Sequence, residues 1–347
     1  MCGIAGYIGR FDPAILATMN RVQGHRGPDG SGEWHDAEVG LAHVRLAILD
    51  LSPAGAQPMA DATGRVIVSF NGEIYNYREL RVELERAGVV FRGDSDTEVL
   101  ANLLARQGRA CLAKLNGIFA FAAWFPAEHR LLLARDAAGV KPLYWATTSQ
   151  GRVFASELKA FRDLPGIDWS LDHAAVTAYL TLLYAPGELT PAKGVSKLPP
   201  GTFVEWTAAG AMTNGSFLHP NYSEEVQPFT DQQAAEGCYH YLGQAVRRQL
   251  VSDVPLGGFL SGGVDSSAIA HFACAELGDP QRYPCFTVSP ADLKGLDSEG
   301  FAEDHPYAVL MARRLGVPLH AATLREAALA DLDELVWALD EPTADVA

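Results

Sequence analysis

The chain has 347 residues, of which 48% are hydrophobic and 20% charged, and a formal net charge of -15. This length suits two domains of ordinary size, and the composition excludes a chain that is disordered throughout. The negative charge argues against a broad surface for nucleic acid or anionic lipid, and no apolar run is long enough for a membrane span, so we expect a cytoplasmic protein.

The first half, residues 2–207, is predicted to contain many short strands and two helices. Residues 66–70 and 73–77 are rich in strand formers and meet at Asn71-Gly72, a type I′ hairpin signal. Helical spacing covers 77–88 and 95–108, the second with a capping box from Ser95 to Glu98. Several further strands are apolar on both faces, which favours a layered α/β sandwich. They are expected at 117–125, 130–136, 141–146 and 152–157.

Residues 208–229 lose all clear periodicity and are interpreted as a linker. Beyond them, in 230–347, helical and strand patterns alternate, which predicts an α/β domain with a doubly wound parallel sheet. Helices are expected at 231–251, 266–277 and 304–316, and strands at 254–260, 282–288 and 318–324.

The five cysteines are odd in number, widely spaced and without a C-x-x-C pair, which indicates neither a disulfide framework nor a zinc site. Cys2 alone has a position that suggests chemistry, because it directly follows Met1. Removal of Met1 leaves a thiol and a free α-amine on one residue, which is a nucleophile with its own base.

Four further motifs accompany Cys2 in the first half: "HRGPDG" at 25–30, "HVRLAILDLS" at 43–52, "NGEIYN" at 71–76 and "GDSDTEV" at 93–99. Taken singly, each is explained by a turn, a surface charge, a hairpin tip or an acidic helix start. Their order and spacing together, with "RDAAGVKPLYW" and "FASELKAF" downstream, resemble the glutaminase domain of class II glutamine amidotransferases.

That resemblance implies an N-terminal-nucleophile αββα sandwich that hydrolyses glutamine to glutamate and ammonia. Cys2 is then the nucleophile, with the Asn71 side chain and the Gly72 N–H as oxyanion donors. Arg45 is expected to bind the carboxylate of glutamine, and Glu73 and Asp96 its ammonium. The glutamine-binding residues that the resemblance implies are Arg45, Leu46, Ile48, Asn71, Gly72, Glu73 and Asp96.

A second motif, "SGGVDSS" at 261–267, lies between an apolar strand and a helix. Small residues there let backbone N–H groups and a helix N-terminus converge on an anion. It is not a Walker A loop, because no Gly-Lys-Ser/Thr follows. The motif resembles the pyrophosphate loop of enzymes that split ATP into AMP and pyrophosphate.

A class II glutaminase followed by this loop resembles the glutamine-hydrolysing asparagine synthetase family. The resemblance implies ATP, Mg²⁺, glutamine and aspartate as ligands, ammonia transfer to an acyl-AMP, and a homodimer as the assembly to test. Asp265 is expected to help hold Mg²⁺, and Leu260 and Val288 to line the adenine pocket. The implied ATP-binding residues are Leu260, Ser261, Gly262, Gly263, Val264, Asp265, Ser266, Ser267 and Val288.

Two departures from the family pattern bear on these expectations. Ala137 and Ala138 stand where the family usually has a basic and an aromatic residue. The family's second signature, of the form G-D-G-G-D-E-L-F-G-G-Y, is absent, so 230–347 is interpreted as an incomplete synthetase domain. We therefore expect glutamine hydrolysis without asparagine formation. Two alternatives stay open: an amidotransferase with another acceptor, and a non-catalytic module that binds glutamine.

Overall fold

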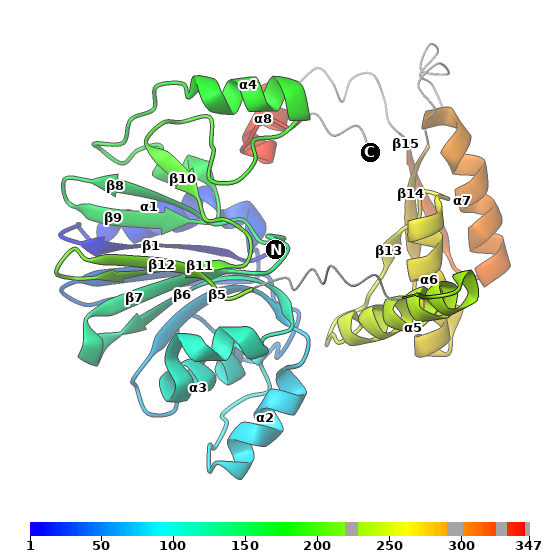
Figure 1. Ribbon diagram of the computed structural model, residues 1–347, viewed down its shortest axis with the longest axis horizontal. Coiled ribbons are helices and arrows are strands. Elements are labelled where there is room, and N and C mark those ends of the chain that lie inside the picture. The colour runs from blue at the N-terminus through cyan, green and yellow to red at the C-terminus, as the bar shows by residue number, and fades with distance from the viewer. Residues whose placement is uncertain (219–227, 290–300, 324–331, 344–347) are drawn as a thin grey trace. The chain divides into compact units, whose positions relative to one another are not determined.

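The computed structural model describes residues 1–218, 228–289, 301–323 and 332–343 (Figure 1). Internal contacts divide the chain into two compact units. The first comprises Met1–Asn221 together with Val336–Ala347, and the second Tyr222–Leu335. A short C-terminal segment therefore packs with the first half of the chain.

The first unit contains two six-stranded sheets in which every pairing of neighbouring strands is antiparallel. The first sheet has the spatial order β10 (Val195–Lys197), β8 (Tyr144–Thr148), β9 (Gly151–Ala155), β1 (Gly3–Gly9), β3 (Val39–Arg45) and β2 (Gly30–His35). The second has the order β12 (Met212–Ser216), β11 (Thr202–Thr207), β7 (Arg130–Arg135), β6 (Gly117–Phe125), β5 (Ile67–Ile74) and β4 (Met59–Ala60).

Helices cover the outer faces of the two sheets, so the unit has four layers. Helix α1 (Ala14–Val22) buries Leu16 and Met19 against the first sheet, α3 (Asp96–Gln107) lies on the second, and α2 (Tyr77–Arg86) packs against α3 (Figure 1). Between the sheets, residues such as Ile4, Leu41 and Trp124 form one hydrophobic core. The predicted αββα sandwich is confirmed.

The two predicted helices begin and end as their sequences indicate. Gly88, with a φ of 84°, follows α2, a conformation that glycine adopts without strain. At the start of α3 the Ser95 hydroxyl accepts from the Glu98 N–H at 3.2 Å. The Glu98 carboxylate accepts instead from the N–H groups of Arg92 and Gly93, at 2.9 Å each, so only half of the predicted capping box forms.

Three local expectations are wrong. Asn71-Gly72 is not a hairpin tip, because β5 runs through both residues and pairs them with Ala120 and Phe119 of β6. Gly72 serves close approach instead: an added Cβ would lie 2.3 Å from the Ile118 carbonyl oxygen. Helices α1 and α4 (His173–Leu182) add to the two predicted ones, and β12 forms within the expected linker. Residues 219–227 of that linker lie outside the described residues.

The second unit holds a parallel sheet, in the order β13 (Gly258–Phe259), β14 (Cys285–Ser289) and β15 (Leu319–Thr323). The predicted parallel α/β alternation is therefore confirmed, although β13 is shorter than the expected strand. The helices are α5 (Asp231–Gln249), α6 (Val264–Leu277), α7 (Phe301–Leu315) and α8 (Leu332–Leu339), the last crossing the boundary between the units.

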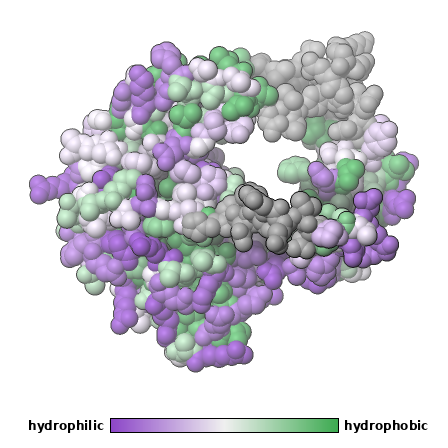
Figure 2. Space-filling model, in the orientation of Figure 1, coloured by the Kyte–Doolittle hydropathy of each residue, from purple (hydrophilic) through white to green (hydrophobic). Residues whose placement is uncertain are grey.

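Apolar side chains also reach the surface of the first unit. Leu180 is 73% exposed, and Leu182 and Leu183 are about half exposed, at the end of α4. Figure 2 shows the hydrophobic surface over this helix. Despite such patches, no helix in the described ranges is long and apolar enough to cross a bilayer.

Candidate active site

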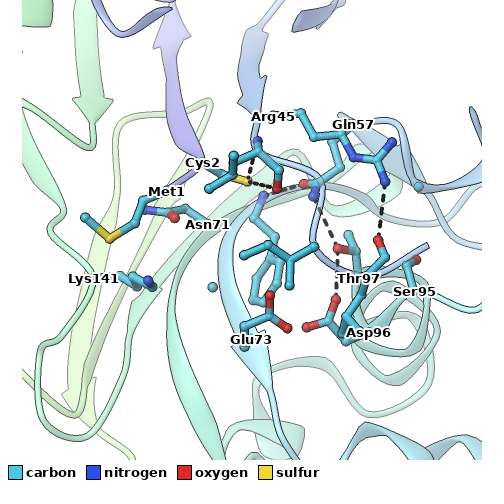
Figure 3. A pocket seen from close by; sticks show the side chains of 16 residues that line it. Met1, Cys2, Arg45, Gln57, Asn71, Glu73, Ser95, Asp96, Thr97 and Lys141 are labelled. Atoms are coloured by element: carbon cyan, nitrogen blue, oxygen red, sulfur yellow. Dashed lines mark hydrogen bonds between the residues drawn. The ribbon is translucent and has the colours of Figure 1, made fainter. Parts of the chain in front are cut away.

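A pocket in the first unit opens beside Cys2, at the start of β1 (Figure 3). Its internal volume is about 70 Å³, and its walls come from the loop after β3, from β5 and from the first turn of α3. The structure brings together in this pocket every residue that the resemblance implies for glutamine. They are Cys2, Arg45, Leu46, Ile48, Asn71, Gly72, Glu73 and Asp96.

The Cys2 sulfur is held by the main chain of Leu46. The Leu46 N–H donates to Sγ at 3.3 Å, and the thiol in turn reaches the Leu46 carbonyl oxygen at 3.5 Å. Burial raises the pKa of the Cys2 thiol, while the Leu46 N–H and the adjacent amino terminus act to lower that pKa. The Leu46 N–H and the amino terminus therefore offset part of the effect of burial, although the pKa stays above its ordinary value.

Asn71 presents an unused hydrogen-bond donor to the pocket. The residue is 1% exposed, and its side-chain Nδ2 has no partner among the described residues. Buried amide groups are normally paired, and leaving one unpaired costs about 1–3 kcal/mol. A donor kept in this state beside a nucleophile is suited to bind an oxygen that the structure does not itself supply.

The Gly72 N–H faces the same pocket edge, as its two neighbours on β5 show. The Phe70 N–H donates to Gln57 Oε1 at 2.7 Å and the Ile74 N–H to Asp96 Oδ2 at 2.9 Å. Backbone N–H directions in a strand repeat every second residue, so the Gly72 N–H points to this edge as well. Phe119, which lies opposite Gly72 on β6, does not use these groups for β5. Its N–H donates to the Asp136 carboxylate, and its carbonyl accepts from the Asp136 N–H.

Asp96 is a buried carboxylate at the start of α3. Burial raises the pKa of Asp96 to about 6, although the N–H groups of Ile74 and Thr97 counteract this rise. The neighbouring Glu73 comes from β5 and lines the same wall (Figure 3). Two carboxylates on one wall suit a cationic group of a ligand.

Arg45 ends β3, and its guanidinium is fixed by the loop that follows. It donates to the carbonyl oxygens of Ser52 at 3.1 Å, Leu49 at 3.4 Å and Asp50. Gly55 makes room for it, because a Cβ there would lie 2.1 Å from Arg45 Nη2. These three donations leave part of the five-donor fork for an anion.

Sequence reasoning missed four pocket-lining polar residues: Gln57, Ser95, Thr97 and Lys141. Gln57 donates through Nε2 to Thr97 Oγ1 at 3.2 Å while it accepts from Phe70, and so links the pocket loop to α3. Nothing in its sequence surroundings distinguishes it. Lys141 could have been found, because it lies in the motif "RDAAGVKPLYW".

A buried ionic chain connects Cys2 with the motif "FASELKAF". Arg26 Nε donates to the Cys2 carbonyl oxygen at 2.9 Å, and Arg26 Nη1 to Glu157 Oε1 at 2.8 Å. Lys159 Nζ lies 3.2 Å from the other oxygen of Glu157. The Lys159 N–H in turn donates to Asp340 Oδ1 at 3.0 Å, which attaches the C-terminal segment to the first unit.

In the second unit, the motif at 261–267 forms the predicted turn between strand and helix. Gly262 has a φ of 92°, Gly263 is the N-cap of α6, and the two hydroxyls Ser261 Oγ and Ser266 Oγ lie 3.0 Å apart. Asp265 stands in the first turn of α6. The loop therefore exposes a helix N-terminus with small residues around it.

The two residues expected to line an adenine pocket differ in exposure. Leu260 has no exposed surface and belongs to the core of the unit, whereas Val288 is about half exposed. A role for Leu260 in contacting a base stays a prediction. Among the described residues, no group of three or more His, Cys, Asp or Glu could hold a metal ion by itself.

Two family models match this chain, one in each half. Residues 1–217 match the family model "Glutamine amidotransferase domain", and residues 238–347 match "Asparagine synthase". Asparagine synthetase [glutamine-hydrolyzing] 1 of Bacillus subtilis is 34% identical over 100% of this chain and 54% of that protein.

Two further relatives extend this picture. The putative asparagine synthetase [glutamine-hydrolyzing] of Mycobacterium bovis is 37% identical over 99% of the chain and 54% of its own length. Amidase chry2 of Gibberella zeae is 30% identical over 100% of the chain and 54% of its own length. The chain thus spans about half the length of the curated relatives it matches.

Proposed function

The chain belongs to the glutamine amidotransferase family, and on that premise we propose that its first unit hydrolyses glutamine to glutamate and ammonia. After Met1 is removed, the Cys2 α-amine takes the thiol proton and the thiolate forms a bond to the side-chain amide carbon. The carbon–nitrogen bond then breaks, and the leaving nitrogen takes that proton as ammonia. Water cleaves the thioester to release glutamate.

The observation that carries this proposal is the unpartnered, buried Nδ2 of Asn71 in the pocket of Cys2. Acyl transfer needs donors placed where the oxygen of the tetrahedral intermediate becomes negative. Asn71 Nδ2 and the Gly72 N–H supply two such donors on one strand. These donors lie in the pocket of a thiol whose sulfur accepts a hydrogen bond from the Leu46 N–H, which favours nucleophilic catalysis over simple binding.

The remaining pocket residues fit the rest of a glutamine molecule. The guanidinium of Arg45 binds its α-carboxylate, and Glu73 and Asp96 hold its ammonium. Leu46 and Ile48 complete the wall along its methylene groups. Support for this arrangement is the convergence of these side chains, which come from β3 and its loop, β5 and α3.

The test is glutamate release from glutamine by the purified chain, by Cys2→Ala and by the control Cys238→Ala. Cys238 is also a free thiol, but it is exposed and lies in the second unit. We expect activity in the parent and the control, and a loss of about 10⁴-fold or more in Cys2→Ala. Glutamine binding without turnover in the parent chain would instead support a non-catalytic module.

We further propose that the second unit binds MgATP at the 261–267 loop and that the whole protein makes asparagine from aspartate. The loop places backbone N–H groups and the start of α6 where an anion can bind. Mg²⁺ is commonly held by one or two carboxylates together with phosphate oxygens and water, and Asp265 fits that role. The ion would neutralise phosphate charge during formation of β-aspartyl-AMP and pyrophosphate.

The acceptor is the least constrained part of this proposal. Two of the three relatives described above carry the name asparagine synthetase, but the third is named an amidase, which keeps a different acceptor open. Pyrophosphate release from MgATP, measured with aspartate and with other carboxylates, distinguishes these cases. We also propose a homodimer, which sedimentation of the purified chain would test, and a cytoplasmic location, which fractionation of cells would test.

A further inference from the structure

Lys141 is a buried cation beside the nucleophile whose role the mechanism above leaves unassigned. Its main chain is fixed on both sides: its N–H donates to Asp136 Oδ2 at 3.0 Å, and its carbonyl accepts from Arg135 Nε at 2.7 Å. The residue is 8% exposed. The turn after β7 therefore holds Lys141 at a fixed place in the pocket wall.

The side chain of Lys141 extends into the pocket, toward the region between Met1 and Glu73 (Figure 3). Within the described part of the chain, its ammonium makes no hydrogen bond or ion pair. The side chain is largely buried while its ammonium lines the pocket, and a cation in such a partly desolvated place favours negative groups beside it. The groups it can compensate are those that become negative or lose a proton during the reaction.

The charges around Lys141 come from every neighbouring element. Burial and the Arg26 guanidinium lower the pKa of Lys141, while Glu73, the Cys2 thiolate and Asp136 raise that pKa. Burial also lowers the pKa of the Met1 α-amine, one residue before Cys2, and Arg26 and Lys141 lower that pKa further, against opposing effects of the Cys2 thiolate and Asp29.

The positive charge of Lys141 acts on the amine and on the thiol in the direction that catalysis needs. A cation near the amino terminus disfavours its ammonium form, so the amine becomes a free base at lower pH. The same cation favours the thiolate over the thiol. Both effects populate the pair that attacks glutamine, which is a neutral amine beside a nucleophilic sulfur.

We propose that Lys141 is a positioning residue for glutamine hydrolysis, whose ammonium keeps the α-amine of mature Cys2 neutral and stabilises its thiolate. This inference rests on the proposed glutaminase function, because it assigns Lys141 to the same site. Lys141 acts only through its charge, and it forms no bond to the substrate. A cation of similar reach should therefore replace it.

The test compares Lys141→Met and Lys141→Gln, which remove the charge, with Lys141→Arg, which keeps it. Lys114→Met is the matched control, because Lys114 is a partly exposed lysine outside the pocket. The first readout is the pH dependence of kcat/KM for glutamine. We expect its acidic limb to move up by about one pH unit in the uncharged variants and to stay in place in Lys141→Arg and Lys114→Met.

The second readout is the rate of Cys2 alkylation by iodoacetamide against pH, in a Cys238→Ala background that removes the exposed thiol. This readout needs no turnover, so it tests Lys141 even if the parent chain fails to hydrolyse glutamine. The same upward shift is expected. Lower activity at every pH with an unmoved profile, or an Arg variant that behaves like Met, would overturn the proposal.

Two variants with the same charge change guard against misfolding. If Lys141→Met does not fold, Lys141→Gln removes the charge with a polar side chain that can still hydrogen-bond. If neither folds, the alkylation profile of Lys141→Arg is compared with that of the parent. Retained charge must keep the two within a few tenths of a pH unit, and a larger shift would overturn the proposal.

Discussion

The glutamine pocket and the 261–267 loop are built in different ways. In the pocket, side chains far apart in sequence converge on β5. Two of them accept hydrogen bonds from its backbone, Gln57 from the Phe70 N–H and Asp96 from the Ile74 N–H. In the loop, the contacts are local: Ser261 Oγ accepts the Gly263 N–H at 3.3 Å and lies beside Ser266 Oγ. The first site depends on particular side chains, and the second on the path of the backbone.

After loss of the nucleophile Cys2 itself, the largest effect should come from the oxyanion donor of the pocket. Replacing Asn71 with Ala should lower kcat for glutamine hydrolysis by roughly 10²–10³-fold, with a smaller change in KM. Because Nδ2 has no partner among the residues that the structure describes, no hydrogen bond seen for that group is lost. Steady-state kinetics of Asn71→Ala and Asn71→Asp measure this. A change confined to KM would make Asn71 a residue that only positions substrate.

The raised pKa of Asp96, about 6, should give the pocket a pH signature. An ionised Asp96 is needed to hold the ammonium of glutamine, so KM should rise by about tenfold one pH unit below that value. Asp94→Asn is a control, since Asp94 is an exposed carboxylate of the same motif. A KM that is flat from pH 7 to 5 would remove Asp96 from substrate binding.

The same shift has a consequence for stability. The folded state favours protonated Asp96. The contribution of this group to the free energy of unfolding is therefore fully present below the ordinary carboxyl pKa and is lost as pH rises through about 6. Asp96→Asn should lose this dependence. Urea unfolding between pH 4 and 7 compares the two chains, and equal slopes would mean that another group dominates the titration.

For the loop, backbone substitution should matter more than loss of a side chain. Gly262 has a φ of 92°, so Gly262→Ala introduces strain of roughly 1–2 kcal/mol and should weaken nucleotide binding by about tenfold. Gly278→Ala is matched, because Gly278 has a φ of 69° but caps the far end of α6. Titration with MgATP should separate the two variants. Glutamine hydrolysis should be unchanged in both.

The smallest effect is expected at an exposed ion pair of the second unit. Arg247 Nε lies 2.7 Å from Glu276 Oε2 on the surface of α5 and α6. Such pairs contribute about 0–1 kcal/mol, so Arg247→Ala should change neither activity and hardly shift thermal unfolding. A large shift would show that this surface is more important to the unit than its exposure indicates.

The sequence predicted the parts of the fold that local patterns encode. The caps at Ser95 and Gly88 mark the start of one helix and the end of another, because they satisfy backbone groups within a few residues. Asn71-Gly72 misled, because the same dipeptide suits a tight turn and a strand pressed against its neighbour. Only the packing of β5 on β6 distinguishes the two.

The candidate site likewise contains residues that the sequence motifs predict and residues that they do not. Cys2, Arg45 and Asp96 stand in motifs, so their convergence could be expected from resemblance. Gln57 could not be found that way, because its importance lies in contacts to Phe70 and Thr97 that no local pattern reports. Long-range side-chain bonds to strand edges are features of the folded chain.

The most direct test of the account is the mass of the chain after reaction with a chloroketone analogue of glutamine. Such an analogue carries the carboxylate and ammonium that Arg45, Glu73 and Asp96 are proposed to bind, with an electrophile at the position of the amide. We predict one adduct, on Cys2 of a chain lacking Met1, and protection by excess glutamine. Glutamine hydrolysis by a chain that retains Met1, or an adduct elsewhere with Cys2 unmodified, would contradict the account.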